Sequence, residues 1–319
     1  MLERRFLNKP NRVAATLLFL LAAIYTAHVL SPAEGWALGT YDMRGLFYPW
    51  WEAARNAVFR GEIPWWDERQ LAGNPFLHNP QIAFFYPLTW IALFFPLNIG
   101  ISVYAFVHLW LAGVGMYLFT SDDLRVTNDK SRSSFVTRKS LLNLPAFLAA
   151  ITFMFSGFFV ARLFAGHSGL FAVHIWLPWL LWATQRTVRR QSTTWAAITS
   201  LFFALIFLAG HVTSVVYMAA IWGLFVLWII FMDDGMRDVD PDHPAHKADD
   251  RHRPSVTPSF RHSVILLASV PILTLLLSAV QLIPTAQLIQ LAGRTGQGSF
   301  EFATDFSFPI THLITIFVP

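Results

Sequence analysis

The chain has no cysteine, and only 13% of its 319 residues are charged. The absence of cysteine excludes a disulfide framework, thiol catalysis and metal sites built on thiolates. Soluble domains carry about twice this share of charge, so a water-soluble enzyme of this size is excluded. A hydrophobic share of 55% excludes a disordered chain as well. The composition therefore indicates a protein that crosses the membrane several times.

Familiar nucleotide and zinc motifs are also missing. The sequence has no P-loop, no GxGxxG fingerprint and no HExxH motif. An enzyme of this composition that uses an activated donor would therefore take that donor from the bilayer. The formal charge of +4 says little about partners, because the position of positive charge matters more than its sum in a membrane protein. We expect membrane lipids as partners and no nucleic acid.

Long stretches without Asp, Glu, Lys or Arg predict the membrane-embedded parts, since one span needs about 20 apolar residues. These stretches are 13–33, 70–121, 140–161, 163–185, 191–232 and 263–293. The fifth is long enough for two helices, and Gly210-His211 marks a turn between them. A last apolar stretch begins at Phe306 and stops at Pro319. We therefore expect residues 1–319 to be one membrane domain, cut short at its C-terminus.

Basic residues predict the orientation of these spans. They concentrate in four segments: 1–12, 121–141, 186–192 and 233–262. Placing all four in the cytoplasm obeys the positive-inside rule and requires one span within 70–121, taken as 99–120. Residues 80–96 are then interfacial or re-entrant. The alternative has the N-terminus outside and two spans within 80–120, but the density of basic residues at the N-terminus favours the first arrangement.

Two further segments need an interpretation. The first apolar stretch is long for a signal peptide and lacks a clear cleavage site, so we expect an uncleaved span. Segment 233–262 is polar, mixed in charge and rich in Pro and His, which predicts a flexible cytoplasmic loop rather than a metal site. With this topology, residues 31–80 form the first outer loop.

The first outer loop contains an expected amphipathic helix. Phe47, Trp51, Ala54 and Val58 recur at helical spacing within 41–60, the pattern of a helix that lies in the headgroup plane. The alternative is a helix that only anchors the loop. Asp42 precedes it and would lie near the membrane rim, where a carboxylate can act as a general base toward a hydroxyl. A helix N-cap is the alternative role for Asp42.

Other ionisable residues fall on the same expected side of the membrane. Asp67 and Glu68 lie beside two tryptophans; they would serve as secondary acids or bind a divalent cation, or else form a solvated turn. His78 would donate a hydrogen bond to a substrate, or be structural. Ionisable groups at the rim are costly to place there, which makes them functional candidates.

Two Gly-His corners and two arginines complete the expected site. His167 and His211 each follow a glycine that lets a helix end, and each would then contact a phosphate or only close its helix. Arg162 and Arg294 carry the donor fork that suits a lipid phosphate, with snorkelling toward headgroups as the alternative.

Three runs of sequence resemble a known family. The run PWWDERQLAGNPFLHNPQIAFFYPLTWI, with SGFFVARLFAGHSGLFAVHIWLPWLLWA and SAVQLIPTAQLIQLAGR, is similar to the YfhO-like bacterial membrane proteins, which are usually much longer. The resemblance implies a GT-C glycosyltransferase: an all-α transmembrane helix bundle with a catalytic acid in the first outer loop, here Asp42. It also implies a polyprenyl-phosphate-linked sugar as donor and an envelope polymer or glycan as acceptor. Many such enzymes have a second acid two residues on, where this chain has Arg44, which favours a site without a metal or other cofactor.

Together these observations predict a multi-pass enzyme of the bacterial plasma membrane with a cytoplasmic N-terminus and a site on the outer face. Asp42 would take the proton of the acceptor hydroxyl, and Arg294, Arg162 or a rim histidine would stabilise the departing lipid phosphate. A lipid or polysaccharide-precursor flippase is the alternative, and a scaffold without catalysis is a third. The clustering of polar groups at one rim favours the enzyme over a transporter, which would need charged or broken helices near the midplane.

Overall fold

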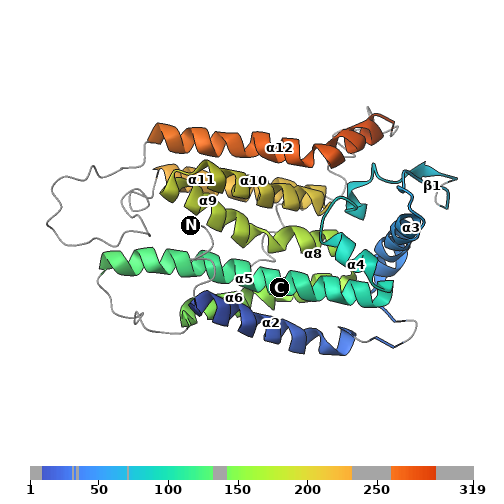
Figure 1. Cartoon of the computed structure of the whole chain (residues 1–319), viewed down its shortest axis with the longest axis horizontal. Helices are drawn as coiled ribbons and strands as arrows, with labels where there is room; N and C mark the ends of the chain where they lie inside the picture. Colours follow the sequence, from blue (N-terminus) through green and yellow to red (C-terminus); the bar gives the residue numbers. More distant parts are fainter. Residues whose placement is uncertain are drawn as a thin grey trace, which may run out of the picture.

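The computed structural model describes residues 9–30, 32–33, 36–69, 72–131, 142–231 and 260–291, and these form a bundle of helices that run along one common direction (Figure 1). The long elements are α2 (Lys9–Leu30), α5 (Leu97–Ser131), α6 (Leu144–Met154), α7 (Gly157–Ala165), α8 (Ser168–Ile175), α9 (Leu177–Arg190), α10 (Thr193–Leu208), α11 (Val212–Phe231) and α12 (Phe260–Leu291). Within the described ranges the only strands are two of two residues each. The predicted all-α bundle is confirmed at this level.

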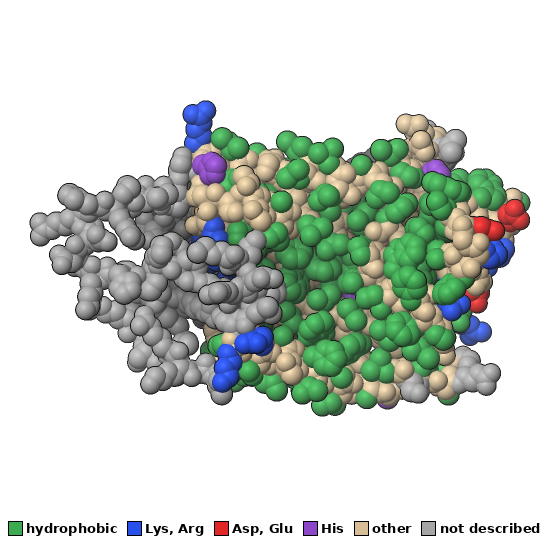
Figure 2. All heavy atoms as spheres, viewed as in Figure 1, with side chains coloured by type: hydrophobic (Ala, Val, Ile, Leu, Met, Phe, Trp, Pro, Cys, Tyr) green, Lys and Arg blue, Asp and Glu red, His purple; other side chains and the backbone are tan. Residues whose placement is uncertain are grey.

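Several elements have the length and composition of membrane spans. Among the described residues they are Lys9–Leu30, Leu97–Asp122, Leu144–Ala165, Val212–Phe231 and Arg261–Gln290. Figure 2 shows hydrophobic side chains over the middle of the bundle, with Lys, Arg, Asp and Glu gathered toward its two ends. Leu224 of α11 and Leu276 of α12 are each 68% exposed. Exposed leucine side chains of this kind are unfavourable in water but favourable against lipid chains. The chain is accordingly treated as a multi-pass membrane protein.

One end of the bundle carries most of the non-helical backbone. There lie η1 (Met43–Phe47), α3 (Tyr48–Phe59), and the antiparallel hairpin of β1 (Trp66–Asp67) and β2 (Asn74–Pro75) (Figure 1). The turns between α7 and α8 and between α10 and α11 open toward this same end, called the α3 end below. The expected grouping of the first loop with the two Gly-His corners is therefore found.

A helix is found where the amphipathic one was expected, as η1 followed by α3. Its apolar positions Phe47, Trp51 and Ala54 are buried, and the Trp51 indole N–H donates to the carbonyl of Ile82 at 3.0 Å. This bond ties α3 to the segment that precedes α5.

Residues 80–96 do not form a second span. They fold into a 3-10 turn, η2 (Pro80–Ile82), and the six-residue α4 (Thr89–Phe94), which packs back on α5. A Cβ added to Gly100 would overlap the carbonyl oxygen of Ala92, so α4 and the first turn of α5 are in backbone contact. The arrangement with one span within 70–121 agrees with the structure, and the two-span alternative does not.

Two expected helices are broken, which corrects the sequence analysis. The stretch 140–161 divides at Phe155–Ser156 into α6 and α7, and α7 runs on to Ala165. Gly166 ends α7, as its place before His167 predicted, but the span expected within 163–185 is divided, because α8 stops before α9 begins. Pro178 lies in the first turn of α9 and lacks the N–H that would continue the hydrogen bonds of α8. The sequence is apolar before and after each break, so composition alone does not reveal where the helices are interrupted.

The opposite end of the bundle is fixed by an ion pair that the sequence analysis missed. Asp122 of α5 accepts hydrogen bonds from the Trp182 indole and the Arg186 guanidinium of α9, each at 2.7 Å. Arg186 also lies over the rings of Trp182 and Trp195, 4.9 Å and 5.2 Å from their centroids. Arg186 belongs to the basic segment 186–192; it lies inside α9 and joins three helices.

Cysteine labelling tests the orientation of the bundle, since the native chain has no cysteine. Glu52 of α3 and Thr193 of α10 are both exposed, at opposite ends. In intact cells, an impermeant maleimide is expected to label Glu52→Cys, and to label Thr193→Cys only after permeabilisation. The unsubstituted chain is the blank. The reverse pattern would invert the topology, and labelling of both variants in intact cells would contradict the fold.

Candidate functional site

Three side chains of the α3 end form a hydrogen-bonded chain. The Asp42 carboxylate oxygen Oδ2 lies 3.0 Å from His167 Nε2, and His167 Nδ1 lies 3.1 Å from an Arg162 guanidinium nitrogen. Arginine offers only donors, so Nδ1 must accept and Nε2 must carry the proton that it donates to Asp42. The contacts thereby select one neutral tautomer of His167 and hold its ring between a carboxylate and a fixed positive charge.

Close backbone packing brings Asp42 to His167. Gly166, with φ +79°, ends α7, and a Cβ added there would lie 2.5 Å from the Met43 backbone nitrogen. A Cβ on Gly39 would lie 3.0 Å from the Cα of Gly166. The Thr40 hydroxyl adds a 2.9 Å hydrogen bond to the carbonyl of Phe164. The first loop therefore rests directly on the α7–α8 corner, and the residues next to the contact point, Asp42 and His167, meet.

The alternative role of Asp42 as a helix cap is not what the structure shows. Asp42 precedes η1, but its side chain makes no capping hydrogen bond and its backbone is already helical, at φ −72° and ψ −32°. Its side chain is 43% exposed and that of His167 is 30% exposed. The carboxylate is thus held by His167 on one side and open to an incoming molecule on the other.

Arg162 is half-buried beside His167. Its Nε is buried without a hydrogen-bond partner among the described residues, and its guanidinium lies 5.3 Å from the Phe158 ring centroid. Beside it, a cavity of about 10 Å³ adjoins His167, Ser168 and Tyr104, which is room for about one water molecule. Its hydrogen bond to Nδ1 means that Arg162 orients the His167 ring.

His211 lies at the adjacent corner. Its Nδ1 accepts hydrogen bonds from the Ser214 hydroxyl at 2.8 Å and the Ser214 backbone N–H at 3.3 Å, which leaves the ring proton on Nε2. Burial, followed by the nearby His174, lowers the pKa of His211 below its ordinary value, which favours the neutral ring. A Cβ on Gly169 would lie 3.7 Å from the His211 Cβ, so the two Gly-His corners are neighbours.

The remaining predicted residues lie elsewhere. The carbonyl of His78 accepts a 3.0 Å hydrogen bond from Thr285 of α12, and no contact in the described ranges joins His78 to Asp42, His167 or Arg162. His78 Nδ1 is buried and has no hydrogen-bond partner in the described part of the chain. Arg294 lies outside the described residues.

The two acids of the hairpin differ, because Glu68 lies in an exposed turn whereas Asp67 is buried. Asp67 is 5% exposed, and its Oδ1 accepts hydrogen bonds from the backbone N–H and the guanidinium of Arg69, at 3.1 Å and 3.2 Å. Glu68 is exposed. In the described ranges, no cluster of three or more His, Asp or Glu side chains is placed to hold a metal ion.

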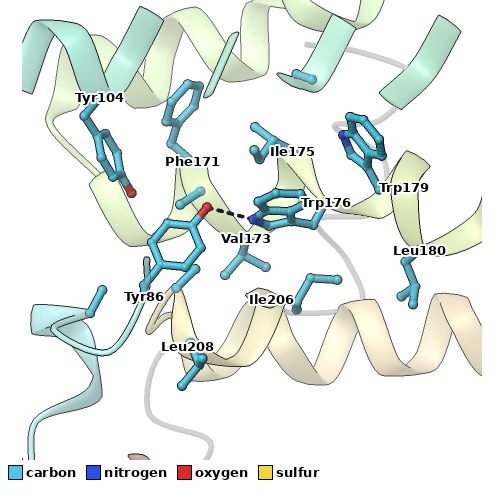
Figure 3. Close-up of a cluster of buried hydrophobic side chains, with 14 of the residues drawn as sticks. Tyr86, Tyr104, Phe171, Val173, Ile175, Trp176, Trp179, Leu180, Ile206 and Leu208 are labelled. Atoms are coloured by element: carbon cyan, nitrogen blue, oxygen red, sulfur yellow. Dashed lines mark hydrogen bonds between the residues drawn. The ribbon is translucent and has the colours of Figure 1, made fainter. Parts of the chain in front are cut away.

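A buried polar network lies beneath the site. His108 Nε2 accepts a hydrogen bond from the Tyr86 hydroxyl at 2.9 Å, and its Nδ1–H donates to the carbonyl of Tyr104 at 2.7 Å. The indole N–H of Trp176 donates to the Tyr86 oxygen at 2.7 Å (Figure 3). Nothing in the sequence near Tyr86 signals these partners, because they lie on α5 and at the α8–α9 break.

No family model, no curated protein and no solved structure matches the chain. The chemistry of the site therefore follows from its own groups. A partly exposed carboxylate that accepts a hydrogen bond from a neutral histidine can take a proton from a hydroxyl. The positive charge of Arg162 behind that histidine can stabilise an anion formed nearby.

Proposed function

We propose that this protein is a membrane glycosyltransferase that moves a sugar from a polyprenyl-phosphate donor to a polymer or glycan of the bacterial envelope. The observation that carries the proposal is the contact of Asp42 with His167, backed by Arg162, at the α3 end of a membrane bundle. The resemblance of the sequence to YfhO-like proteins, which implies a GT-C fold, agrees with this proposal. With the N-terminus in the cytoplasm, the site would face the outside of the bacterial plasma membrane.

The reaction would be a direct displacement at the anomeric carbon. The acceptor oxygen bonds to that carbon as Asp42 takes the hydroxyl proton, and the bond to the phosphate oxygen breaks with its electron pair leaving on the lipid phosphate. His167 orients the Asp42 carboxylate, and the Arg162 charge stabilises the negative charge that develops on the leaving group. The loss of one such donor typically lowers a rate by about 10²–10³-fold.

A cavity next to Asp42 has room for the head of such a donor. It measures about 640 Å³ and is lined by Arg44, Tyr48, Asn98 and Trp36, with Met43 on its wall. Ligand sites commonly measure about 300–1,000 Å³. Arg44, Tyr48 and Asn98 each offer a hydrogen-bond donor to a sugar phosphate. Because Arg44 takes the place of a second acid, the phosphate charge would be met by a guanidinium rather than by a metal ion.

The alternative of a flippase has one observation in its favour. Helices α8 and α9 are interrupted at Trp176, and broken helices are a feature of transporters. The interruption is filled, however: Trp176 stacks on Phe202, with 5.7 Å between ring centroids, and bonds Tyr86. A closed, packed break does not offer a path for a polar headgroup.

Reconstitution tests the proposal and separates it from the alternatives. The purified chain in liposomes would be supplied with a panel of polyprenyl-phosphate hexoses and with envelope glycan, and the products followed by mass spectrometry. For one donor, free polyprenyl phosphate and extended glycan are expected in equal amounts, and empty liposomes should yield neither. Movement of intact donor between leaflets would instead assign a flippase. If no donor of the panel is cleaved or moved between leaflets, both the glycosyltransferase and the flippase are contradicted, and a scaffold without catalysis remains.

A further inference from the structure

A second candidate site lies on the hairpin, apart from Asp42. Trp65 and Trp66 are 58% and 56% exposed. A Cβ added to Gly73, where φ is +107°, would lie 2.6 Å from Trp66 Nε1, so this indole rests directly on the glycine backbone. The β1–β2 pairing of Trp66 with Pro75 fixes its backbone. Trp66 is therefore a pre-positioned aromatic surface with more than half of its area open.

These tryptophans adjoin a large open cavity between α3 and the hairpin. The cavity measures about 480 Å³, and its polar lining consists of Asn56, Arg60, Glu62, Asp67, Glu68 and Arg69. The volume falls in the range of sites for small molecules and short oligomers. The hollow is thus bounded by flat rings on one part of its wall and by hydrogen-bonding groups on the rest.

The charges around the cavity are mutually paired and keep spare hydrogen-bonding capacity. Arg60 binds a single oxygen of Glu62, through Nε at 3.0 Å and Nη2 at 2.8 Å, and this contact lowers the pKa of the Glu62 carboxyl. Arg69 binds Asp67 through Nε alone. Asp67 Oδ2 is buried without a hydrogen-bond partner among the described residues. The wall therefore offers both carboxylate acceptors and guanidinium donors that these contacts leave unused.

The lining selects among classes of ligand. A lipid chain would desolvate the ionic groups without replacing their hydrogen bonds, which is costly. A polyanion is disfavoured, because three carboxylates face two guanidinium groups. A saccharide fits both the aromatic and the polar parts of the cavity wall. Its C–H faces pack on flat aromatic rings, and its hydroxyls donate to carboxylates and accept from arginines.

We propose that the cavity between α3 and the β1–β2 hairpin binds a saccharide chain, with Trp66 as the stacking surface and Glu62 and Arg69 as hydroxyl partners. The binding itself needs no catalysis. That the bound chain is the acceptor for Asp42 rests on the proposed function, and it would make the hairpin the element that presents the acceptor.

Calorimetry on the full chain in detergent micelles tests this binding without any donor present. The probes are soluble oligosaccharides of glucose, mannose, galactose and N-acetylglucosamine, four to six units long. One of these series is expected to bind, and Trp66→Ala is expected to weaken that binding at least tenfold. Glu62→Gln alters a fully exposed group, so it should fold normally and weaken binding several-fold.

A matched control separates recognition from membrane anchoring, a common role of tryptophan at the interface. Phe94 of α4 is 65% exposed and lines neither this cavity nor the one beside Asp42. Phe94→Ala should leave saccharide binding unchanged. If Trp66→Ala leaves saccharide binding as unchanged as Phe94→Ala does, Trp66 only anchors the hairpin at the interface and the proposal is overturned. The absence of binding across all four series would also overturn the proposal.

Failure of this inference is distinguishable from failure of the proposed function. Asp42→Asn should bind the oligosaccharide with unchanged affinity although it no longer transfers a sugar. If the protein binds a saccharide but cleaves no donor, the binding site at the hairpin is supported and the proposed glycosyltransferase activity is contradicted.

Discussion

Asp42→Asn is expected to lower sugar transfer by about 10²–10⁴-fold, the usual contribution of a general base. Asparagine matches aspartate in shape and keeps an oxygen that accepts the His167 Nε2–H bond of 3.0 Å, so the corner should stay assembled. What it loses is the ability to take a proton at neutral pH. Initial rates of polyprenyl phosphate release by the reconstituted variant give the measurement.

Glu52→Gln is the matched control for this prediction. Glu52 is an exposed carboxylate of α3, in the same loop as Asp42 and outside both cavities. The substitution removes the same charge and should leave the rate within about twofold of the original. Equal losses in the two variants would show that loop charge matters rather than the Asp42 base, and an unchanged rate for Asp42→Asn would remove Asp42 from the mechanism.

The largest effect on stability is expected for Gly210→Ala. Gly210 has φ +89°, which alanine adopts only with strain, and an added Cβ would overlap the carbonyl oxygen of Pro80. Backbone strain and overpacking each cost about 1–3 kcal/mol, so we expect a loss of about 2–5 kcal/mol. Because Pro80 would be pushed away, the His211 corner should also lose its fixed position.

Thermal unfolding in detergent measures this loss, and Gly157→Ala is its control. Gly157 begins α7, its φ is not positive, and an added Cβ there would meet nothing within 4 Å. Alanine at that helical position should be neutral or slightly stabilising. If the Gly210→Ala and Gly157→Ala proteins unfold at the same temperature, the close contact between the α10–α11 turn and η2 is contradicted.

Hydrophobic runs predict the bundle well but not its interruptions. Charge-free stretches locate the spans, and the spacing of Phe47, Trp51 and Ala54 locates α3. The breaks at Phe155–Ser156 and at Trp176 were missed, because a buried helix is apolar on every side and its apolar pattern continues across a break. The sequence also does not show that Arg186 of α9 pairs with Asp122 of α5.

Part of the site could be predicted, and the rest depends on distant contacts. The positive-inside rule placed Asp42 with the Gly166-His167 and Gly210-His211 corners, which the structure brings to one end. It gave no way to tell that His78 would face α12 instead. The contact of Asp42 with His167 requires two glycines, Gly39 and Gly166, to touch across more than a hundred residues, and single residues carry no signal of such pairing.

The Tyr86 hydroxyl also constrains how the protein is made. Its donor, the Trp176 indole, lies 90 residues further along the chain, whereas its other partner, His108, follows only 22 residues later. Both partners are synthesised after Tyr86, and α8 and α9 enter the membrane well after α5. The segment that supports the α3 end can therefore reach its final position only late in biogenesis, after most of the described helices are in place.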